Sequence, residues 1–297
     1  MGTFRVRGVI PAVFTPFTEG GRSLDEGALR AHVQWLIGQG VHGLMPCGTT
    51  GEGLLLSTPE RRRILEVVLA SALGRVPVIA HVGAVTTRET VELARHAEEC
   101  GADALSVITP PFYHLTDAAL MAHYCRVAEA VPATPVFLYN IPQNTGNSLS
   151  LAAAEAIAAR CPNVIGIKDS AGDLSHLLAF VALRGGSFQV VCGTDSLILQ
   201  ALEGGACACV SGNANVFPDV VVGLFEAFSR GDQEQARRWQ MRLQEVLQAL
   251  GGDGISLMKR ALGMRGLSAG YVRPPLPEAD DEMVAELERR LRRAQLL

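Results

Sequence analysis

The chain has 297 residues, of which 48% are hydrophobic and 19% charged, and its formal net charge is −4. This is the composition of an ordinary globular protein, and it offers no basic stripe for nucleic acid. We expect no signal peptide and no membrane span, because the N-terminus lacks a long apolar stretch and no segment reaches about eighteen uninterrupted apolar residues. The seven scattered cysteines favour reduced thiols and a cytoplasmic location.

Short apolar runs alternate with longer helical stretches along the chain. The runs predict strands at residues 8–17, 43–47, 76–82, 104–110, 135–140, 164–170, 189–194 and 208–215. Several of the helical stretches open with capping residues, such as Thr58-Pro59 and Thr116. Eight strand–helix units predict an α/β fold, a parallel sheet closed into a (β/α)8 TIM barrel. A doubly wound open sheet is the alternative, disfavoured because no G-x-G-x-x-G follows the first strand.

The end of the chain differs from the rest, because the pattern beyond residue 230 is helical only. We therefore expect a barrel catalytic domain over residues 1–230 and a C-terminal helical extension, packed on the barrel, over residues 231–297. No Gly/Ser-rich linker or low-complexity stretch separates the two.

Lysine is scarce: among 26 Lys and Arg residues, only positions 168 and 259 hold lysine. Arginine cannot replace lysine where a deprotonated amine must attack a carbonyl group, because guanidinium stays protonated. Lys259 stands beside an arginine in a predicted helix, and we interpret it as a surface charge. Lys168 ends an apolar strand, where partial loss of hydration favours the free amine. A structural lysine paired with Asp169 or another carboxylate is the alternative, but the scarcity of lysine favours a nucleophile.

Other reactive residues also follow the predicted strands, at the edge where barrel enzymes hold their active sites. The segment GTTGEG, residues 48–53, permits close backbone approach, and its exposed N–H groups can hold a carboxylate. Its two adjacent hydroxyls add donors and a path for a proton. Tyr139 ends the fifth run and can shuttle a proton. The structural alternatives are a glycine-rich turn and a core tyrosine. The seven histidines show no metal-binding spacing, so we expect no metal.

The motifs GTTGE, YNIP-x-x-TG and GIKDS, in this order, resemble the dihydrodipicolinate synthase / N-acetylneuraminate lyase family of class I Schiff-base aldolases. The resemblance covers nearly the whole chain, including VSGNANVFP and VRPPLP. It implies a TIM barrel with C-terminal helices and a lysine imine with pyruvate or another 2-oxo acid. It also implies a homotetramer, a dimer of dimers, and no external cofactor.

The resemblance assigns the proton relay and the covalent step to particular residues. Lys168 corresponds to the Schiff-base lysine, Tyr139 to the relay tyrosine, and Thr49 to a further relay member. The family often adds a tyrosine hydroxyl from its TP-x-Y segment across a subunit interface. That position holds Phe112 here, with Tyr113 one residue on.

The resemblance also implies which residues bind the substrate. Thr50, with backbone help around Gly48, corresponds to the residue that holds the pyruvate carboxylate. Gly193 and Val210 lie where the family lines the pocket with main-chain groups. Asn144 stands where synthases of lysine precursors carry an arginine for the second substrate's carboxylate, so the lysine-pathway identity is weakly supported.

The sequence thus predicts a metal-independent carbon–carbon or carbon–oxygen lyase. Its substrate is pyruvate or a pyruvate-releasing 2-oxo acid of the 2-keto-3-deoxy sugar acid or 4-hydroxy-2-oxoglutarate type. One alternative is a 4-hydroxy-tetrahydrodipicolinate synthase of lysine biosynthesis. Another is a barrel that binds a 2-oxo acid without catalysis, which the presence of both Lys168 and Tyr139 disfavours. A dehydrogenase is a distant third, because the chain lacks a dinucleotide-binding loop.

Overall fold

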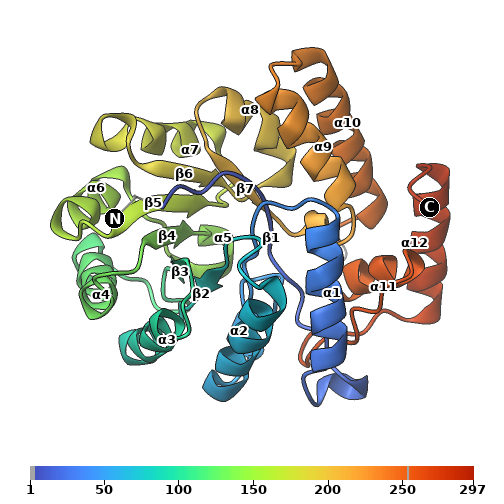
Figure 1. The fold of residues 1–297 in the computed structure, drawn as a ribbon, viewed down its shortest axis with the longest axis horizontal. Coiled ribbons are helices and arrows are strands. Elements are labelled where there is room, and N and C mark those ends of the chain that lie inside the picture. The colour runs from blue at the N-terminus through green and yellow to red at the C-terminus, as the bar shows by residue number, and fades with distance from the viewer. Residues whose placement is uncertain (1–3, 253) are drawn as a thin grey trace. The chain divides into compact units, whose positions relative to one another are not determined.

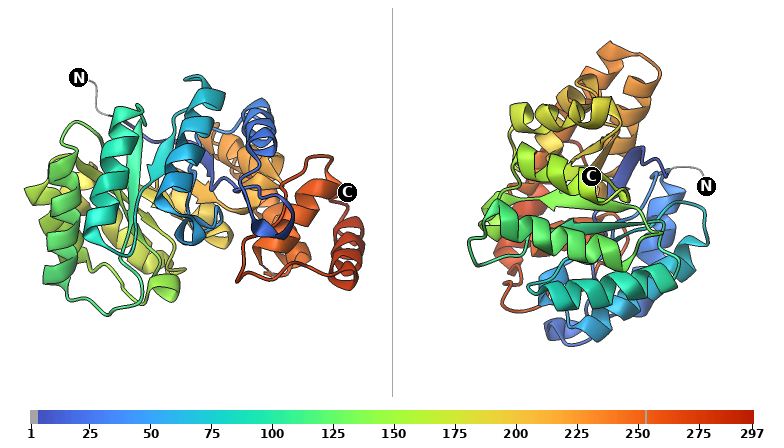
Figure 2. Two further views of the ribbon diagram at one scale, coloured as in Figure 1. Left: turned by 90° about the horizontal axis from the view of Figure 1, so that it is seen from below. Right: turned by 90° about the vertical axis from the view of Figure 1, so that its left-hand side faces the viewer.

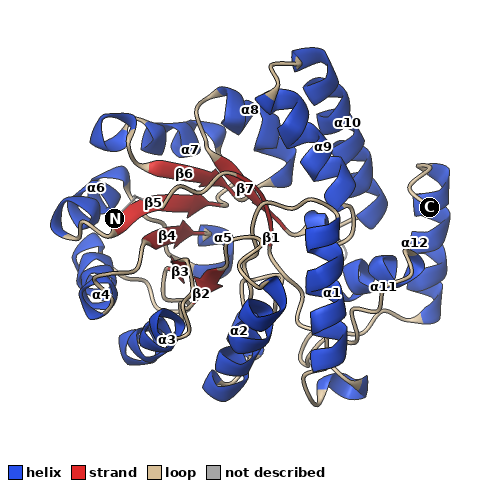
Figure 3. Ribbon diagram, in the orientation of Figure 1, coloured by secondary structure: helices blue, strands red, loops and turns tan. Residues whose placement is uncertain are grey.

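The computed structural model describes residues 4–252 and 254–297. Helices and strands alternate along most of this length (Figures 1 and 3). The chain divides into two compact units. Unit 1 is the stretch up to Gly8 together with Pro77–Val210, and unit 2 is Val9–Val76 together with Ser211–Leu297. No helix of the described residues is long and apolar enough to cross a membrane.

Unit 1 is a parallel sheet with helices along one side of its strands (Figure 3). Its strands pair in the order of the chain, and every paired strand is parallel to its neighbour. The strands are β2 (Ile79–His81), β3 (Ala104–Ile108), β4 (Val136–Asn140), β5 (Val164–Asp169), β6 (Gln189–Cys192) and β7 (Ala208–Ser211), whose last residue belongs to unit 2. The helices are α3 (Thr87–Glu99), α4 (Asp117–Ala130), α5 (Pro142–Thr145), α6 (Leu151–Arg160), α7 (Leu174–Val181) and α8 (Ile198–Glu203).

The strands of unit 1 are buried almost throughout, which explains their continuous apolar runs. Their register brings the chemically important residues to one level. Tyr139 of β4 pairs with Lys168 of β5, and Lys168 pairs with Val191 of β6. Parallel pairing therefore places the ends of β4 and β5 side by side, as the predicted strand-end arrangement requires.

Unit 2 holds the first two helices of the chain and its C-terminal helices. These are α1 (Glu26–Gly38), α2 (Thr58–Ala72), α9 (Pro218–Ser229), α10 (Gln233–Leu250), α11 (Ile255–Met264) and α12 (Asp281–Arg293). α1 packs on α2, α10 packs along α9, and α12 packs against α10 and α11 (Figure 2). The predicted boundary at residue 230 falls between α9 and α10; the division into barrel and extension stays a prediction.

The first two predicted strands are shorter than the sequence suggested. β1 is Gly8–Pro11, and the run at 43–47 forms no strand of its own but isolated bridges, among them a parallel one between Met45 and Ala12. Met45 donates to the carbonyl of Pro11 at 3.0 Å and accepts from Val13 at 3.0 Å. Pairing stops there because Pro46 has no N–H and Cys47 turns to a left-handed φ of 59°.

Helix starts agree with the predicted capping signals, with one shift. Thr116 caps α4 as expected, accepting a hydrogen bond from the backbone N–H of Ala119. At α2, however, the N-cap is Ser57, and Thr58 is already helical. Ser57 and Glu60 form a reciprocal capping box, which satisfies two otherwise unpaired backbone donors.

Candidate active site

Lys168 and Tyr139 lie in direct contact at the ends of β5 and β4. The Lys168 Nζ atom stands 3.7 Å from the centroid of the Tyr139 ring. Both residues are buried, with 6% and 1% of their surfaces exposed. A cation over the face of a tyrosine ring is attracted by its electron density, so the ring holds the amino group in one place. The structure thus brings together the two residues that the sequence singled out.

The space beside Lys168 depends on a glycine at position 193. A Cβ atom on Gly193 would lie 1.9 Å from the Ser170 Oγ atom and 2.9 Å from the Lys168 Cε atom. Its backbone N–H donates to the carbonyl of Asp169 at 2.8 Å. Gly193 therefore lies next to Lys168, and any larger residue would displace the lysine side chain. Val210, also predicted to line the pocket, is buried on β7.

Asp169 follows Lys168 in sequence but has other partners. One of its oxygens accepts hydrogen bonds from Asn140 Nδ2 at 3.1 Å and from the N–H of Ala171 at 2.9 Å. The other lies 2.9 Å from Nδ1 of His176 on α7. Among the described residues, no carboxylate forms an ion pair with Lys168. The alternative of a structural Lys168–Asp169 pair is therefore wrong, because alternation along β5 sends the two side chains to opposite faces.

His81 is a neighbour of this pair that sequence reasoning missed. Its ring meets that of Tyr139 edge-on, with centroids 5.8 Å apart and planes at 85°. It is buried on β2 and pairs in register with Ser106, which is also buried. The signal was present in the sequence as two polar residues inside the apolar runs 76–82 and 104–110.

The segments after β3 and β4 place the remaining predicted residues at the surface of unit 1. Phe112 is 82% exposed and adopts a left-handed φ of 83°, which is unusual for a bulky residue. Tyr113 is 68% exposed and packs its ring against that of Phe112. Asn144 is exposed on α5, next to Thr145, whose hydroxyl lies 2.8 Å from that of Thr109.

In unit 2 the GTTGEG segment forms a tight loop that only glycine permits. A Cβ on Gly51 would lie 2.6 Å from the carbonyl oxygen of Val13, and one on Gly53 would lie 1.8 Å from that of Cys47. The hydroxyl of Thr15 donates to the carbonyl of Gly51 at 2.6 Å. The loop is thus fixed by its backbone, and the predicted ligand residues lie on it. Gly48 is buried, Thr49 is exposed and Thr50 is half-buried.

Lys259 holds this loop from the inside, so its interpretation as a surface charge was wrong. It is only 2% exposed, and Nζ donates to the Glu52 carboxylate at 2.6 Å and to the carbonyls of Thr15 and Tyr271 at 2.7 and 2.6 Å. Burial lowers the pKa of Lys259, and the Glu52 carboxylate opposes that shift. The second Glu52 oxygen accepts from the backbone N–H of Arg273 at 2.7 Å. The error arose because Lys259 lies on the buried face of α11, and the local sequence did not indicate which face of this helix is buried.

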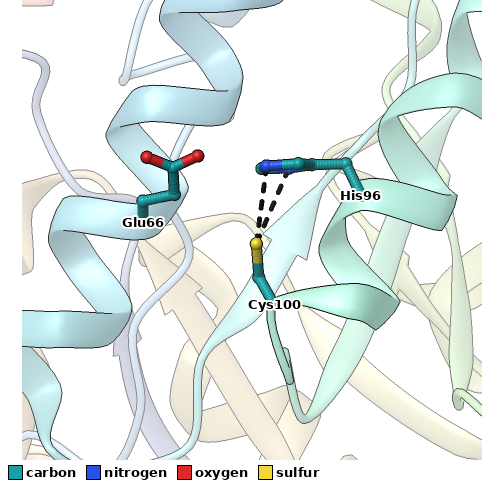
Figure 4. A group of neighbouring side chains, drawn as sticks. All are labelled: Glu66, His96 and Cys100. Carbon is teal, nitrogen blue, oxygen red and sulfur yellow. Dashed lines mark hydrogen bonds between the residues drawn. The ribbon is translucent and has the colours of Figure 1, made fainter.

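His96 of α3 and Cys100, the residue that caps the C-terminus of this helix, lie in contact (Figure 4). They stand one turn apart, with Cys100 Sγ 3.4 Å from His96 Nε2. The contact gives no information on the metal dependence of the reaction, and metal independence stays a prediction.

Residues 5–294 match the model of the dihydrodipicolinate synthetase family. The chain belongs to this family. It is 37% identical over 295 residues to a 4-hydroxy-tetrahydrodipicolinate synthase of Methanopyrus kandleri, covering 99% of this chain and 98% of that one. It is 43% identical over 284 residues to an uncharacterized DapA-like lyase of Halobacterium salinarum, covering 95% and 92%. The sequence-based assignment to the family is thereby confirmed.

The similarity to the family also holds for the three-dimensional structure. The E. coli K12 prophage protein YagE, crystallised with pyruvate, superposes with a TM-score of 0.93 at 33% identity, covering 98% of this chain and 99% of that one. The predicted fold class, a (β/α)8 TIM barrel with C-terminal helices, is confirmed. Family members are Schiff-base lyases and synthases, so the chain is an enzyme of this class.

We predict that Lys259→Met destabilises the protein by about 3–5 kcal/mol, because it leaves the Glu52 carboxylate buried without its counter-ion. The double variant Glu52→Gln/Lys259→Met removes both charges and is expected to recover part of the loss. Urea denaturation measures the free energy of unfolding.

The neighbouring Arg260→Met is the matched control. Arg260 pairs with Glu278 near the surface, so the loss expected there is below about 1 kcal/mol. A Lys259→Met variant as stable as the control would contradict the role given to the Lys259–Glu52 pair.

Proposed function

We propose that the protein is a class I aldolase that cleaves a hydroxylated 2-oxo acid to pyruvate and a carbonyl compound through an imine on Lys168. The contact between the Lys168 amino group and the Tyr139 ring, without a carboxylate partner for the lysine, carries this proposal. A lysine that served only as a structural charge would be expected to pair with an anion when buried.

The covalent step uses Lys168 as the nucleophile. Its neutral amine adds to the keto carbon C2, and the Tyr139 hydroxyl passes a proton to the developing alkoxide. Water then leaves and an iminium forms. Loss of the C4 hydroxyl proton breaks the C3–C4 bond, and the electron pair enters the iminium to give an enamine. Protonation at C3 and hydrolysis release pyruvate and regenerate the free lysine.

Binding of the 2-oxo acid is assigned to the residues that match the family's motifs. Thr50 and the backbone around Gly48 hold the carboxylate, and Thr49 joins the proton relay. Gly193 and Val210 supply main-chain groups to the pocket. The order of GTTGE, YNIP and GIKDS along the chain supports these roles. No external cofactor or metal takes part, because the iminium itself accepts the electron pair.

Asn144 favours aldol cleavage over the synthase reaction. Arginine binds a second carboxylate with two parallel, charge-assisted hydrogen bonds, and losing such a pair costs on the order of 1.5–3 kcal/mol. Asn144 offers only a neutral amide. Arg184 donates to the carbonyl of Val164 at the start of β5, the end opposite Lys168, so it is poorly placed to replace that arginine. Arg22 bonds locally, to the carbonyl of Glu19.

We further propose a cytoplasmic homotetramer, a dimer of dimers, without nucleic-acid partners. The exposed ring pair of Phe112 and Tyr113 supports assembly, because two large aromatic side chains in water gain from burial against another subunit. No two cysteines of the described residues are joined in a disulfide, as suits a reducing compartment.

The experiment that tests the function compares two reactions of the purified enzyme, both run with EDTA present. We expect pyruvate release from hydroxylated 2-oxo acids to have a higher kcat/KM than condensation of pyruvate with aspartate semialdehyde. A semialdehyde reaction faster by tenfold or more would assign the lysine-pathway synthase instead. Activity that appears only after zinc or magnesium is added would contradict the metal-free mechanism.

We predict that Tyr139→Phe lowers kcat by about a hundredfold or more, because it removes the hydroxyl that carries the proton while keeping the ring under Lys168. Steady-state kinetics of pyruvate release measure kcat. Tyr124→Phe is the matched control: Tyr124 is equally buried, and its hydroxyl donates to the carbonyl of Val107 at 3.2 Å. The control should keep near-normal turnover, and a Tyr139→Phe variant that did the same would return Tyr139 to a packing role.

A further inference from the structure

His81 approaches the Lys168–Tyr139 pair from a strand that does not border it. It lies on β2, and β3 separates β2 from β4, the strand of Tyr139. Ser106 of β3 is in register with His81 on one side and with Phe137 of β4 on the other. Phe137 stands two residues before Tyr139, and alternate residues of a strand point to the same face. The imidazole therefore meets Tyr139 diagonally, across β3, on the face that Lys168 shares.

Small residues along this diagonal leave room for the imidazole. Ser106 is the β3 residue that the imidazole crosses, and its side chain is among the smallest. The next β3 residue on this face is Ile108, which packs over Gly83: a Cβ on this glycine would lie 2.6 Å from the Ile108 Cγ2 atom. Ile108 is also in register with Tyr139. Any side chain at position 83 would therefore displace Ile108, whose neighbour on the other side is the tyrosine.

A histidine and a serine are unfavourable choices for this place. Only 5% of the His81 surface and 1% of the Ser106 surface is exposed. Among the described residues, the Ser106 hydroxyl has no hydrogen-bond partner, and a buried hydroxyl without a partner destabilises the fold. Aliphatic residues would fill a buried parallel strand without this cost. Position 81 therefore needs a property of the imidazole that an aliphatic side chain lacks.

That property is a flat, rigid ring. The centroids of the His81 and Tyr139 rings are 5.8 Å apart with planes at 85°, as in edge-to-face aromatic pairs. The Lys168 Nζ atom lies 3.7 Å from the centroid of the same tyrosine ring. The hydroxyl is the Tyr139 atom farthest from the backbone, so a swing of the side chain moves it more than any other atom. A ring held by the imidazole therefore keeps its hydroxyl in one place relative to the lysine amine.

We propose that His81 is a positioning residue of the lyase reaction. Its imidazole holds the Tyr139 ring at the angle from which the phenol hydroxyl serves the carbinolamine that forms on Lys168. The inference rests on the proposed imine chemistry and adds a residue to it. His81 itself transfers no proton in this role, because it acts through the tyrosine ring.

The test follows imine formation, with pyruvate as the probe. Enzyme and pyruvate are mixed, borohydride is added after set times, and peptide mass spectrometry measures the reduced adduct on Lys168. Two quantities result, namely the limiting rate at saturating pyruvate and the pyruvate concentration that gives half this rate. We expect His81→Leu to lower the limiting rate by about tenfold, because small misplacements of a catalytic group are costly. The half-saturating concentration should hardly change, since other residues are assigned to the pyruvate carboxylate.

Two further variants separate ring positioning from packing. His81→Phe keeps a flat ring at this position, so we expect a limiting rate within about threefold of the unaltered protein. His123→Leu is the matched control. His123 is also 5% exposed, and its ring meets that of Tyr124 edge-on at 5.3 Å and 79°. This change removes the same kind of contact away from Lys168, and the limiting rate should stay the same.

A double-mutant cycle with Tyr139→Phe shows whether His81 acts through the phenol hydroxyl. Once this hydroxyl is removed, nothing is left for the imidazole to position. We therefore expect His81→Leu to slow the Tyr139→Phe enzyme no further, although it slows the unaltered enzyme by about tenfold. A residue that only stabilised the fold would have the same effect in both backgrounds.

The outcomes separate this inference from the proposed function. An unchanged limiting rate in His81→Leu, a His81→Phe variant as slow as His81→Leu, or a further tenfold loss in the Tyr139→Phe background overturns the positioning role while the imine chemistry stands. If His81→Leu does not fold, His81→Gln, which is polar but has no ring, takes its place with the same expectation. If neither folds, His81 is a structural residue and the inference is wrong. If the unaltered protein forms no adduct on Lys168, the proposed function fails and the inference fails with it.

Discussion

The contact between the Lys168 amino group and the face of the Tyr139 ring joins the ends of two neighbouring strands. β4 and β5 are parallel and in register there, so the backbone hydrogen bonds of the sheet set the distance between the two residues. Gly193 keeps the adjoining space open, and the His81 ring packs edge-on with that of Tyr139. The chemistry proposed for the protein depends on this arrangement, because the amine and the phenol must act on the same atoms.

The two lysines of the chain are both buried, and each has a task for which arginine is unsuited. Lys168 must lose its proton to attack a carbonyl group. Lys259 is a compact ammonium that meets three oxygens at once in a space enclosed by Glu52, Thr15 and Tyr271. Scarcity of lysine in the sequence was therefore informative at both positions. Only the role of Lys168 was predicted. An apolar strand shows in the sequence that its residues are buried, whereas the helix around Lys259 does not show which of its faces is buried.

The sequence predicted the fold where local signals and packing agree. Buried parallel strands appear as apolar runs, so β3 to β7 were located to within a few residues. The run at 43–47 reduced to isolated bridges ending at Met45, since Pro46 and the left-handed Cys47 end the pairing. His81 was missed because its contact with Tyr139 joins strands far apart in sequence, and the Asp169–His176 pair was missed because it forms no recognisable spacing.

The central claim is that Lys168 forms the imine. Incubation with pyruvate, reduction with borohydride and peptide mass spectrometry test it directly, and the chain's two lysines make the assignment unambiguous. The account predicts a reduced pyruvate adduct on the peptide that contains Lys168, absent in Lys168→Arg. An adduct on Lys259, or none under conditions where pyruvate binds, would contradict it.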